Sequence, residues 1–228
     1  MPRYGLGKIG EMIKSKEIYG VVIDPKDTNP TGFPKTGLGV SLGGLMGALS
    51  KAGLIDITEA ELNSALNEIT EIRKTWNVTE MAKNLYGNLP VLFGARPLLG
   101  SLNAGRNAFC EISRNYIQFY DFPEVNHVLV EAMGRPTCAL NNYYLFFESN
   151  FYNDRVKLRF EITKDLLNRQ NLKNSTYQLQ GSTLLVQNLE LAHYCAWLAF
   201  NFSVLDNVDP GPEPWIIELK TRLSQPIH

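Results

Sequence analysis

Acidic, basic and imidazole side chains gather in two short stretches of this chain. The first, Phe122–Glu131, reads Phe-Pro-Glu-Val-Asn-His-Val-Leu-Val-Glu, and the second, Asn207–Leu223, contains Lys220. A carboxylate, a histidine and a lysine can each take up or release a proton during a reaction. The two stretches therefore hold candidate residues for acid–base chemistry.

Both stretches resemble signatures in the C-terminal half of the bifunctional phosphoglucose/phosphomannose isomerases of bacteria and archaea. Those enzymes run roughly Pro-Glu-Leu-Asn-His-Asn-Glu in the first, and Gly-Val-Asp-Pro followed by Ile-x-x-Leu-Lys in the second. Here the second begins Asn-Val-Asp-Pro at Asn207, and the resemblance extends from about Ile18 to Leu223. It implies interconversion of glucose 6-phosphate or mannose 6-phosphate with fructose 6-phosphate, without a cofactor.

The resemblance also implies which groups the reaction uses. Isomerisation of an aldose removes the C2 proton, so it needs a carboxylate base, a cation beside the enediolate and a group that opens the ring. In the family these are a Glu, an Arg and a His, with a Lys near the C-terminus. Here Leu129 stands in place of the Glu, Lys35 in place of the Arg, and Val128–Ala192 contains no histidine.

Glu131 and Lys35 are the candidates for the altered positions. Two residues turn a helix by about 200°, so Glu131 would point away from the face of Leu129. Its alternative role is a solvated surface carboxylate. Lys35 keeps the charge of the arginine but lacks its planar fork, and its alternative is a lysine that solvates the first turn of a helix.

Lys220 is the best-preserved catalytic candidate, because the stretch Asn207–Lys220 aligns with the family pattern without a gap. The alternative is a solvated lysine on a terminal helix. Glu111 and Arg114 match charged positions of the family and either line the cleft or brace it. The candidates for substrate binding are Glu111, Arg114, Asn126 and His127, although we favour a hydrogen-bonded structural role for the histidine.

Strand and helix signals alternate along the chain, which favours an α/β fold. Thr58 and Glu61 have the spacing of a capping box, and the glycines of 38–54 predict tight packing against a sheet. Short apolar runs predict strands at 18–23, 89–94, 117–121, 143–147 and 178–185. Helical spacing predicts helices at 38–54, 58–74, 98–116, 126–133, 155–168, from about 186 to 204, and 215–223.

The resemblance gives this α/β pattern a domain organisation. It implies a flavodoxin-like sugar isomerase (SIS) domain, in which helices flank a parallel sheet. Residues 85–228 would form one complete lobe. Residues 1–80 would be the remnant of a first SIS domain with connecting helices, and the family's phosphate-binding loops would lie largely in the missing part.

Composition is that of an ordinary globular protein, with 44% hydrophobic and 20% charged residues and a net charge of -1. This balance gives no electrostatic footprint for nucleic acid, and no apolar stretch is long enough to span a membrane. Three widely spaced cysteines, Cys110, Cys138 and Cys195, predict neither a disulfide framework nor a metal site. We therefore expect a cytoplasmic protein.

Two functions remain open at this point. The first is an isomerase that acts on a phosphorylated hexose, incomplete or impaired as this chain stands. We expect a homodimer, because family members build each active site across a two-fold interface. The second is a non-catalytic module that binds a sugar phosphate or serves in dimerisation.

Overall fold

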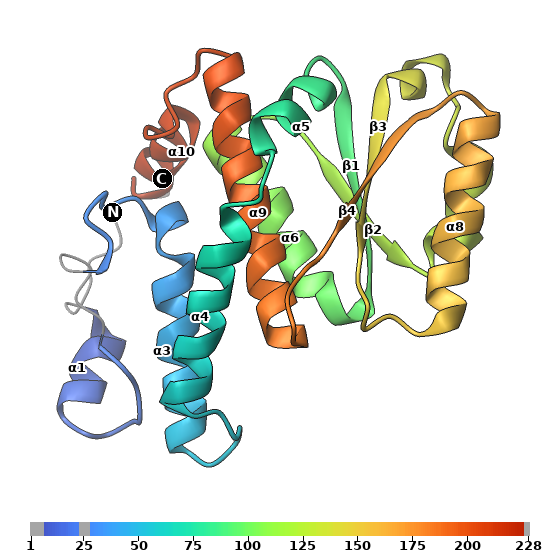
Figure 1. Ribbon diagram of the computed structural model, residues 1–228. Coiled ribbons are helices and arrows are strands. Elements are labelled where there is room, and N and C mark those ends of the chain that lie inside the picture. Colours follow the sequence, from blue (N-terminus) through green and yellow to red (C-terminus); the bar gives the residue numbers. More distant parts are fainter. Residues whose placement is uncertain (1–6, 23–27, 226–228) are drawn as a thin grey trace. The chain divides into compact units, whose positions relative to one another are not determined.

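The computed structural model describes residues 7–22 and 28–225 (Figure 1). The chain divides into two compact units, residues 1–64 and 65–228. The predicted segments, 1–80 and 85–228, were drawn from a family resemblance rather than from packing, and their assignment to two SIS domains stays a prediction.

The described part of the first unit contains helices and no strand. It contains α1 (Lys8–Lys14), a 3-10 turn η1 (Pro34–Thr36) and α3 (Leu38–Lys51). The predicted strand at 18–23 is wrong over residues 18–22, which form no strand, while residue 23 lies outside the described residues. Tyr19 and Val21 of this run are exposed, because no described neighbour pairs with it.

The glycines of α3 do not pack as expected. A Cβ added at Gly39, Gly43 or Gly47 would meet nothing within 4 Å. The helix itself contains no buried residue. The apolar, glycine-rich sequence therefore indicated the helix correctly but not its tight packing.

Helix α4 (Glu59–Arg73) begins at the predicted capping box. The Thr58 N–H donates to Glu61 Oε2 at 2.8 Å, and the Glu61 N–H donates to Thr58 Oγ1 at 3.2 Å. The Thr58 N–H and the Thr58 hydroxyl, which both donate to Glu61 Oε2, hold the pKa of Glu61 below its usual value. Each side chain thus satisfies a backbone donor that the first turn leaves without a partner.

Removing this cap should loosen the first turn of α4. We expect Thr58→Ala to lower the stability of that turn by about 1 kcal/mol, since the Glu61 N–H loses its acceptor. Faster amide hydrogen exchange at Glu61 would report the loss. Thr70→Ala on the same helix, which removes only a hydroxyl bonded to its own helix, is the control. Unchanged exchange in Thr58→Ala would contradict the prediction.

The second unit is built around a four-stranded parallel sheet. Its strands are β1 (Leu89–Ala95), β2 (Gln118–Phe122), β3 (Asn142–Glu148) and β4 (Lys173–Gln178), in the order β2-β1-β3-β4. All three pairings are parallel. This order follows the doubly wound, flavodoxin-like arrangement, in which the connections reverse direction between β1 and β3. The predicted α/β class is confirmed.

One strand lies earlier in the chain than predicted. The expected strand at 178–185 is wrong, because β4 ends at Gln178 and Leu184 already begins a helix. Strand β4 has the polar sequence Lys-Asn-Ser-Thr-Tyr-Gln and occupies the edge of the sheet. An edge strand needs little apolar surface, so the hydrophobic pattern did not reveal it.

Helices cover both faces of the sheet. Helix α8 (Asp154–Arg169) packs on one face, while α5 (Val78–Leu85), α6 (Leu99–Ala108) and α9 (Leu184–Leu205) pack on the other (Figure 1). The remaining elements are short: η2 (Arg96–Leu98), a π-turn η3 (Phe109–Ser113), α7 (Val125–Val128), η4 (Val130–Ala132) and η5 (Thr137–Asn141). The chain's last described helix is α10 (Pro214–Leu223).

The core lies between these layers and is rich in aromatic side chains. The rings of Phe93, Phe122 and Phe146 are fully buried, and Phe93 contacts both of the others edge-on. Such contacts contribute beyond the apolar area that they bury. A well-packed sheet therefore fixes where each strand ends.

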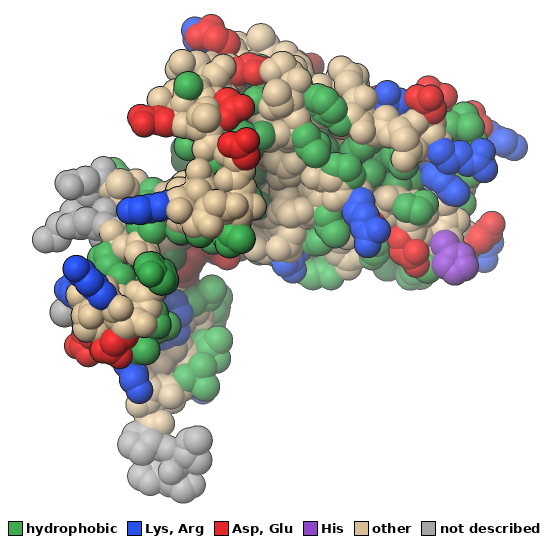
Figure 2. All heavy atoms as spheres, turned by 90° about the horizontal axis from the view of Figure 1, so that it is seen from below, with side chains coloured by type: hydrophobic (Ala, Val, Ile, Leu, Met, Phe, Trp, Pro, Cys, Tyr) green, Lys and Arg blue, Asp and Glu red, His purple; other side chains and the backbone are tan. Residues whose placement is uncertain are grey.

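The outside of the protein carries charges of both signs. Figure 2 shows acidic and basic side chains interspersed over one face of the molecule. Among residues 7–22 and 28–225, no helix combines the length and the apolar character that crossing a membrane requires.

Candidate functional site

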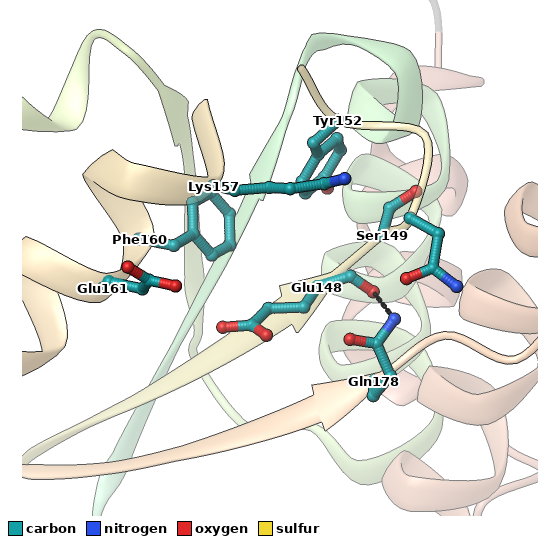
Figure 3. Close-up of a pocket in the computed structure, with 8 residues that line it drawn as sticks. Glu148, Ser149, Tyr152, Lys157, Phe160, Glu161 and Gln178 are labelled. Carbon is teal, nitrogen blue, oxygen red and sulfur yellow. Dashed lines mark hydrogen bonds between the residues drawn. The ribbon is translucent and has the colours of Figure 1, made fainter. Parts of the chain in front are cut away.

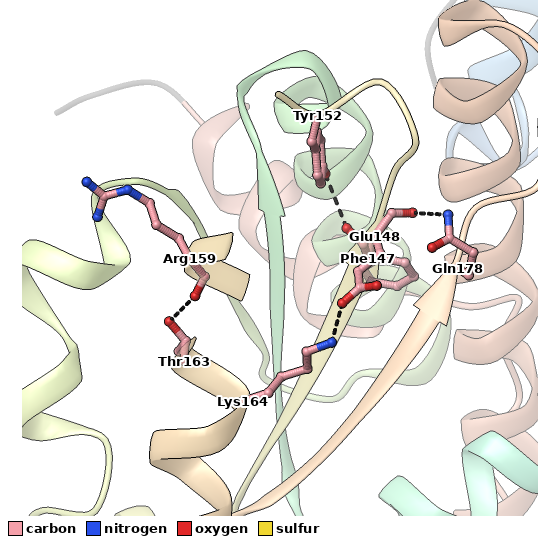
Figure 4. A network of polar contacts seen from close by, with 7 residues as sticks. All are labelled: Phe147, Glu148, Tyr152, Arg159, Thr163, Lys164 and Gln178. Atoms are coloured by element: carbon pink, nitrogen blue, oxygen red, sulfur yellow. Dashed lines mark hydrogen bonds and ion pairs between the residues drawn. The ribbon is translucent and has the colours of Figure 1, made fainter. Parts of the chain in front are cut away.

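The candidate site lies at the carboxyl ends of the strands, where parallel α/β sheets bind their ligands. The Tyr152 side chain bridges the carboxyl ends of β1 and β3. Its hydroxyl accepts from the Ala95 N–H at 2.9 Å. The same hydroxyl donates to the Phe147 carbonyl at 3.2 Å (Figure 4). Burial raises the pKa of Tyr152, so the phenol keeps its proton.

Beside this phenol a cavity of about 170 Å³ opens at the ends of β3 and β4 (Figure 3). Its lining is largely polar and includes two carboxylates, two amides and an ammonium group: Glu148, Glu161, Asn150, Gln178 and Lys157. A larger hollow of about 290 Å³ lies along α9, where His193, Ala196, Trp197 and Phe200 line it. Of these two cavities we assign function to the smaller one, because it sits at the strand ends and has a polar lining, whereas the larger lies along α9 with a mostly apolar lining.

Hydrogen bonds fix the floor of the cavity. Lys164 Nζ donates to Glu148 Oε1 at 2.5 Å, and both side chains are mostly buried. Gln178 Nε2 donates to the carbonyl of Glu148 at 3.3 Å (Figure 4) and to that of Leu179 at 3.0 Å. These bonds hold the glutamate and the glutamine in place before any ligand arrives.

The loops around the cavity are tied to α9. Gln187, which is fully buried, accepts from the Ser149 hydroxyl at 2.5 Å and donates to the Gly181 carbonyl at 3.0 Å. Ser149 follows β3, and Gly181 follows β4. One side chain therefore sets the spacing between two loops at the site.

Glu190 supports the β4–α9 loop from inside. Its buried carboxylate accepts from the Gln180 N–H at 3.0 Å, the Gly181 N–H at 2.9 Å and the Tyr177 hydroxyl at 2.8 Å. Burial raises the pKa of Glu190, and these donors oppose the rise. On the outer side of the loop, Glu68 accepts from the Ser182 N–H and hydroxyl.

Leu129 and Glu131 lie in the short helical turns after β2. Leu129 is half-buried and packs against the core, whereas Glu131 is exposed in η4. The position at which the sequence resemblance expects the family's carboxylate is therefore occupied by an apolar side chain against the core. Glu131 as a catalytic base stays a prediction.

Asn126 connects two helices rather than standing free. It donates to Thr163 Oγ1 at 2.8 Å and accepts from Arg159 Nη1 at 3.1 Å, which joins α7 to α8. The neighbouring His127 is exposed, and its ring forms no hydrogen bond with the part of the chain described here. The structural hydrogen bonds that we expected of His127 are thus formed by Asn126 instead.

Arg114 braces the chain ahead of the last helix. Its guanidinium donates to the carbonyls of Asp209 at 3.1 Å and Pro212 at 2.7 Å. Glu111 lies half-buried in the π-turn just before it. Of the two roles considered for the pair, bracing is the one that the contacts of Arg114 support.

The two lysine candidates lie on different units. Lys220 is exposed near the end of α10, which has no buried residue. Lys35 belongs to η1, with Nζ 5.4 Å from the centroid of the Phe33 ring. Their catalytic roles stay predictions.

The sequence patterns missed the residues of the cavity. Glu148, Lys157 and Gln178 come from two strands and a helix and share no motif spacing. The available signal was positional, because a polar residue directly after a buried strand lies at its carboxyl end. Glu148 follows the predicted strand 143–147 in this way.

Comparison with known proteins gives consistent results. Residues 77–223 match the family model of the bacterial phospho-glucose isomerase C-terminal SIS domain. The chain is 27% identical over 227 residues to the bifunctional phosphoglucose/phosphomannose isomerase of Aquifex aeolicus, covering 96% of this chain and 66% of that protein. For the enzyme of the same name from Caldicellulosiruptor bescii the identity is 22% over 232 residues, with the same coverage.

Solved structures agree on the fold. A glucose-6-phosphate isomerase like protein from Thermus thermophilus has a TM-score of 0.61 at 19% identity, over 83% of this chain and 63% of that one. Glucosamine-6-phosphate deaminase from Thermotoga maritima has a TM-score of 0.55 at 14% identity, over 81% and 56%. The chain spans 66% of the length of each of the two bifunctional isomerases compared above. Because the family model covers more than half of the chain, this protein belongs to the family of bacterial phosphoglucose isomerase C-terminal SIS domains.

Proposed function

We propose that this chain serves the interconversion of glucose 6-phosphate or mannose 6-phosphate with fructose 6-phosphate, and that by itself it is catalytically impaired. The observation that carries this proposal is the family match over 77–223 combined with Leu129 at the carboxylate position. The match supports the substrate class. The packing of Leu129 against the core supports the impairment.

The missing carboxylate matters because proton removal from C2 is the demanding step. A positioned general base contributes about 10² to 10⁴ in rate. Leucine offers no lone pair, and the exposed Glu131 belongs to a different turn. Lys35 and Lys220 are retained as the candidate cations of the proposed reaction, at the enediolate and near the ring oxygen.

The first test is an enzymatic assay coupled to fructose 6-phosphate. We expect no detectable turnover from the native chain. Leu129→Glu should give a low but measurable rate, because it introduces a carboxylate while the positioning of the substrate stays incomplete. Leu129→Gln, which has the same shape and no basic oxygen, is the control and should stay inactive.

A second variant decides between the two carboxylates. Glu131→Gln is expected to change nothing in any form of the protein. Robust native turnover that Glu131→Gln abolishes would show that Glu131 is the base and that the chain is a working enzyme.

A homodimer is part of the same proposal. Helix α10 exposes five large apolar side chains: Trp215, Ile216, Ile217, Leu219 and Leu223. Apolar surface of this kind usually marks an interaction site. The same observation favours the second candidate function, a non-catalytic dimerisation module. Sedimentation should show a dimer at micromolar concentration, and a stable monomer would count against both ideas.

We also propose a cytoplasmic location. The structure has free thiols at Cys110, Cys138 and Cys195. Free thiols are typical of proteins kept in a reducing compartment.

A further inference from the structure

A histidine and a tryptophan form a hydrogen-bonded pair one turn apart on α9. The Trp197 indole N–H donates to His193 Nε2 at 2.9 Å. An indole nitrogen can only donate a hydrogen bond, so His193 Nε2 must be the unprotonated acceptor of a neutral imidazole. The bond therefore exists only while the His193 ring is uncharged.

This pair forms part of the wall of the 290 Å³ hollow on α9. Ala196 and Phe200 complete the lining, and the Phe200 ring lies nearly perpendicular to that of Trp197, with 6.0 Å between their centroids. In the part of the chain that the structure describes, His193 is the one group that accepts a hydrogen bond from the indole. The bond to His193 thus fixes the position of the indole and, with it, the shape of the hollow.

The two rings of the pair differ in how firmly they are held. His193 is half-buried and packs nearly perpendicular to Trp76, with 5.2 Å between the ring centroids. Trp76 in turn contacts the buried Tyr194 and packs against the core. Trp197, by contrast, is 39% exposed. If the bond between the pair is lost, the exposed indole should move and the imidazole should stay.

The charges around His193 favour its neutral form. Burial lowers the pKa of His193 below the ordinary value of 6.5, and the positive charge of Arg73 on α4 adds to this effect. Glu190 lies one turn earlier on α9, but its carboxylate accepts from Tyr177 and from the β4–α9 loop. No carboxylate within the described ranges forms an ion pair with the ring. The imidazole is therefore neutral near pH 7 and takes up its proton only in more acidic solution.

We propose that His193 and Trp197 form a pH-sensitive switch, in which a proton on His193 Nε2 breaks the hydrogen bond, releases the Trp197 indole and opens the hollow on α9. Protonation turns Nε2 into a donor, so two N–H groups would face each other across 2.9 Å. The released indole N–H then finds its acceptor in water. This switch is independent of the proposed isomerase reaction, because α9 carries both residues away from the strand ends.

The test follows the aromatic side chains of the native chain by NMR between about pH 8 and pH 5. The amide spectrum shows whether the chain stays folded over this range. We expect the Trp197 indole N–H resonance to shift with the same midpoint as the His193 imidazole, below 6.5. Overhauser contacts between the two rings should weaken over the same range. The indole resonance of Trp215, on α10, should not follow this transition.

His193→Gln is the decisive variant, because the amide oxygen of glutamine can accept from the indole but has no proton to gain. The Trp197 resonance should then stay constant with pH. His127→Gln is the matched control, since His127 is an exposed histidine on α7, and it should leave the transition unchanged. A transition that survives His193→Gln, or one that disappears in His127→Gln, would overturn the proposal.

A further pair of variants separates the hydrogen bond from burial alone. Trp197→Phe should raise the pKa of His193, because the neutral ring loses its donor. Phe200→Leu alters the same hollow without touching this bond, so it should leave that pKa unchanged. Equal shifts in the two variants would overturn the proposal. If His193→Gln fails to fold, the native chain decides, because an indole resonance that stays constant while His193 titrates would overturn it as well.

Discussion

Replacing Glu190 with leucine should cost the second unit about 3–5 kcal/mol of unfolding free energy, because three donors around this buried carboxylate lose their acceptor at once. Those donors are the backbone of Gln180 and Gly181 and the hydroxyl of Tyr177. Urea unfolding followed by tryptophan fluorescence measures the loss, since the three tryptophans, at positions 76, 197 and 215, all belong to this unit. Glu71→Leu, on the exposed surface of α4, should change stability little.

The pH dependence of stability offers a separate check on Glu190. Its pKa in the folded state lies above the ordinary value of 4.5, so the folded protein holds this proton more firmly than the unfolded chain. The resulting stabilisation is complete below the unfolded pKa and is lost as pH rises through the folded value. Glu190→Gln should remove this contribution to the change of unfolding free energy with pH. An unchanged pH dependence in Glu190→Gln would contradict the assignment.

Gly105→Val should destabilise the second unit by about 3 kcal/mol, because overpacking forces helices apart. A Cβ at this position would lie 2.8 Å from Sγ and 3.0 Å from Cβ of Cys195, which is fully buried in α9. The glycine thus sets how closely α6 approaches α9. The same fluorescence-detected unfolding measures the effect.

Gly100 provides the matched control on the same helix. A Cβ there meets nothing within 4 Å, so Gly100→Val should be close to neutral. Combining Gly105→Val with Cys195→Ala should recover part of the loss, since the sulfur is the nearest obstacle. If the two glycine variants were equally stable, close packing would not be the reason for Gly105.

The sequence predicted the central strands because burial on both faces leaves a continuous apolar run. Strand β3 shows this directly, with Leu145, Phe146 and Phe147 in succession, all fully buried. The edge strand β4 has no such run, and the apolar run at 18–22 has no partner strand in the described part of the chain. An apolar run indicates a strand only where a neighbouring strand exists to pair with it, and without that neighbour the run can stay exposed.

The candidate site was less accessible to prediction, because a motif identifies residue types and not what they contact. Arg114 and Asn126 were expected at the substrate, yet they bond to the backbone of another loop and to the side chains of another helix. Lys157 and Gln178 carried no signal, since only the sheet brings them together. The capping box at Thr58 was predictable because both partners lie in one turn.

The Tyr152 bridge limits how far the ends of β1 and β3 can move, and so how much the site must rearrange when a ligand binds. A phenol that holds the Ala95 amide and the Phe147 carbonyl prevents the ends of β1 and β3 from separating by local fluctuation. The Ala95 amide should then exchange its hydrogen only through global opening, among the slowest in the protein. A ligand would therefore bind to a preformed cavity, without a slow conformational change before binding. Association would be a single fast step, limited by encounter and orientation rather than by the protein's own motion.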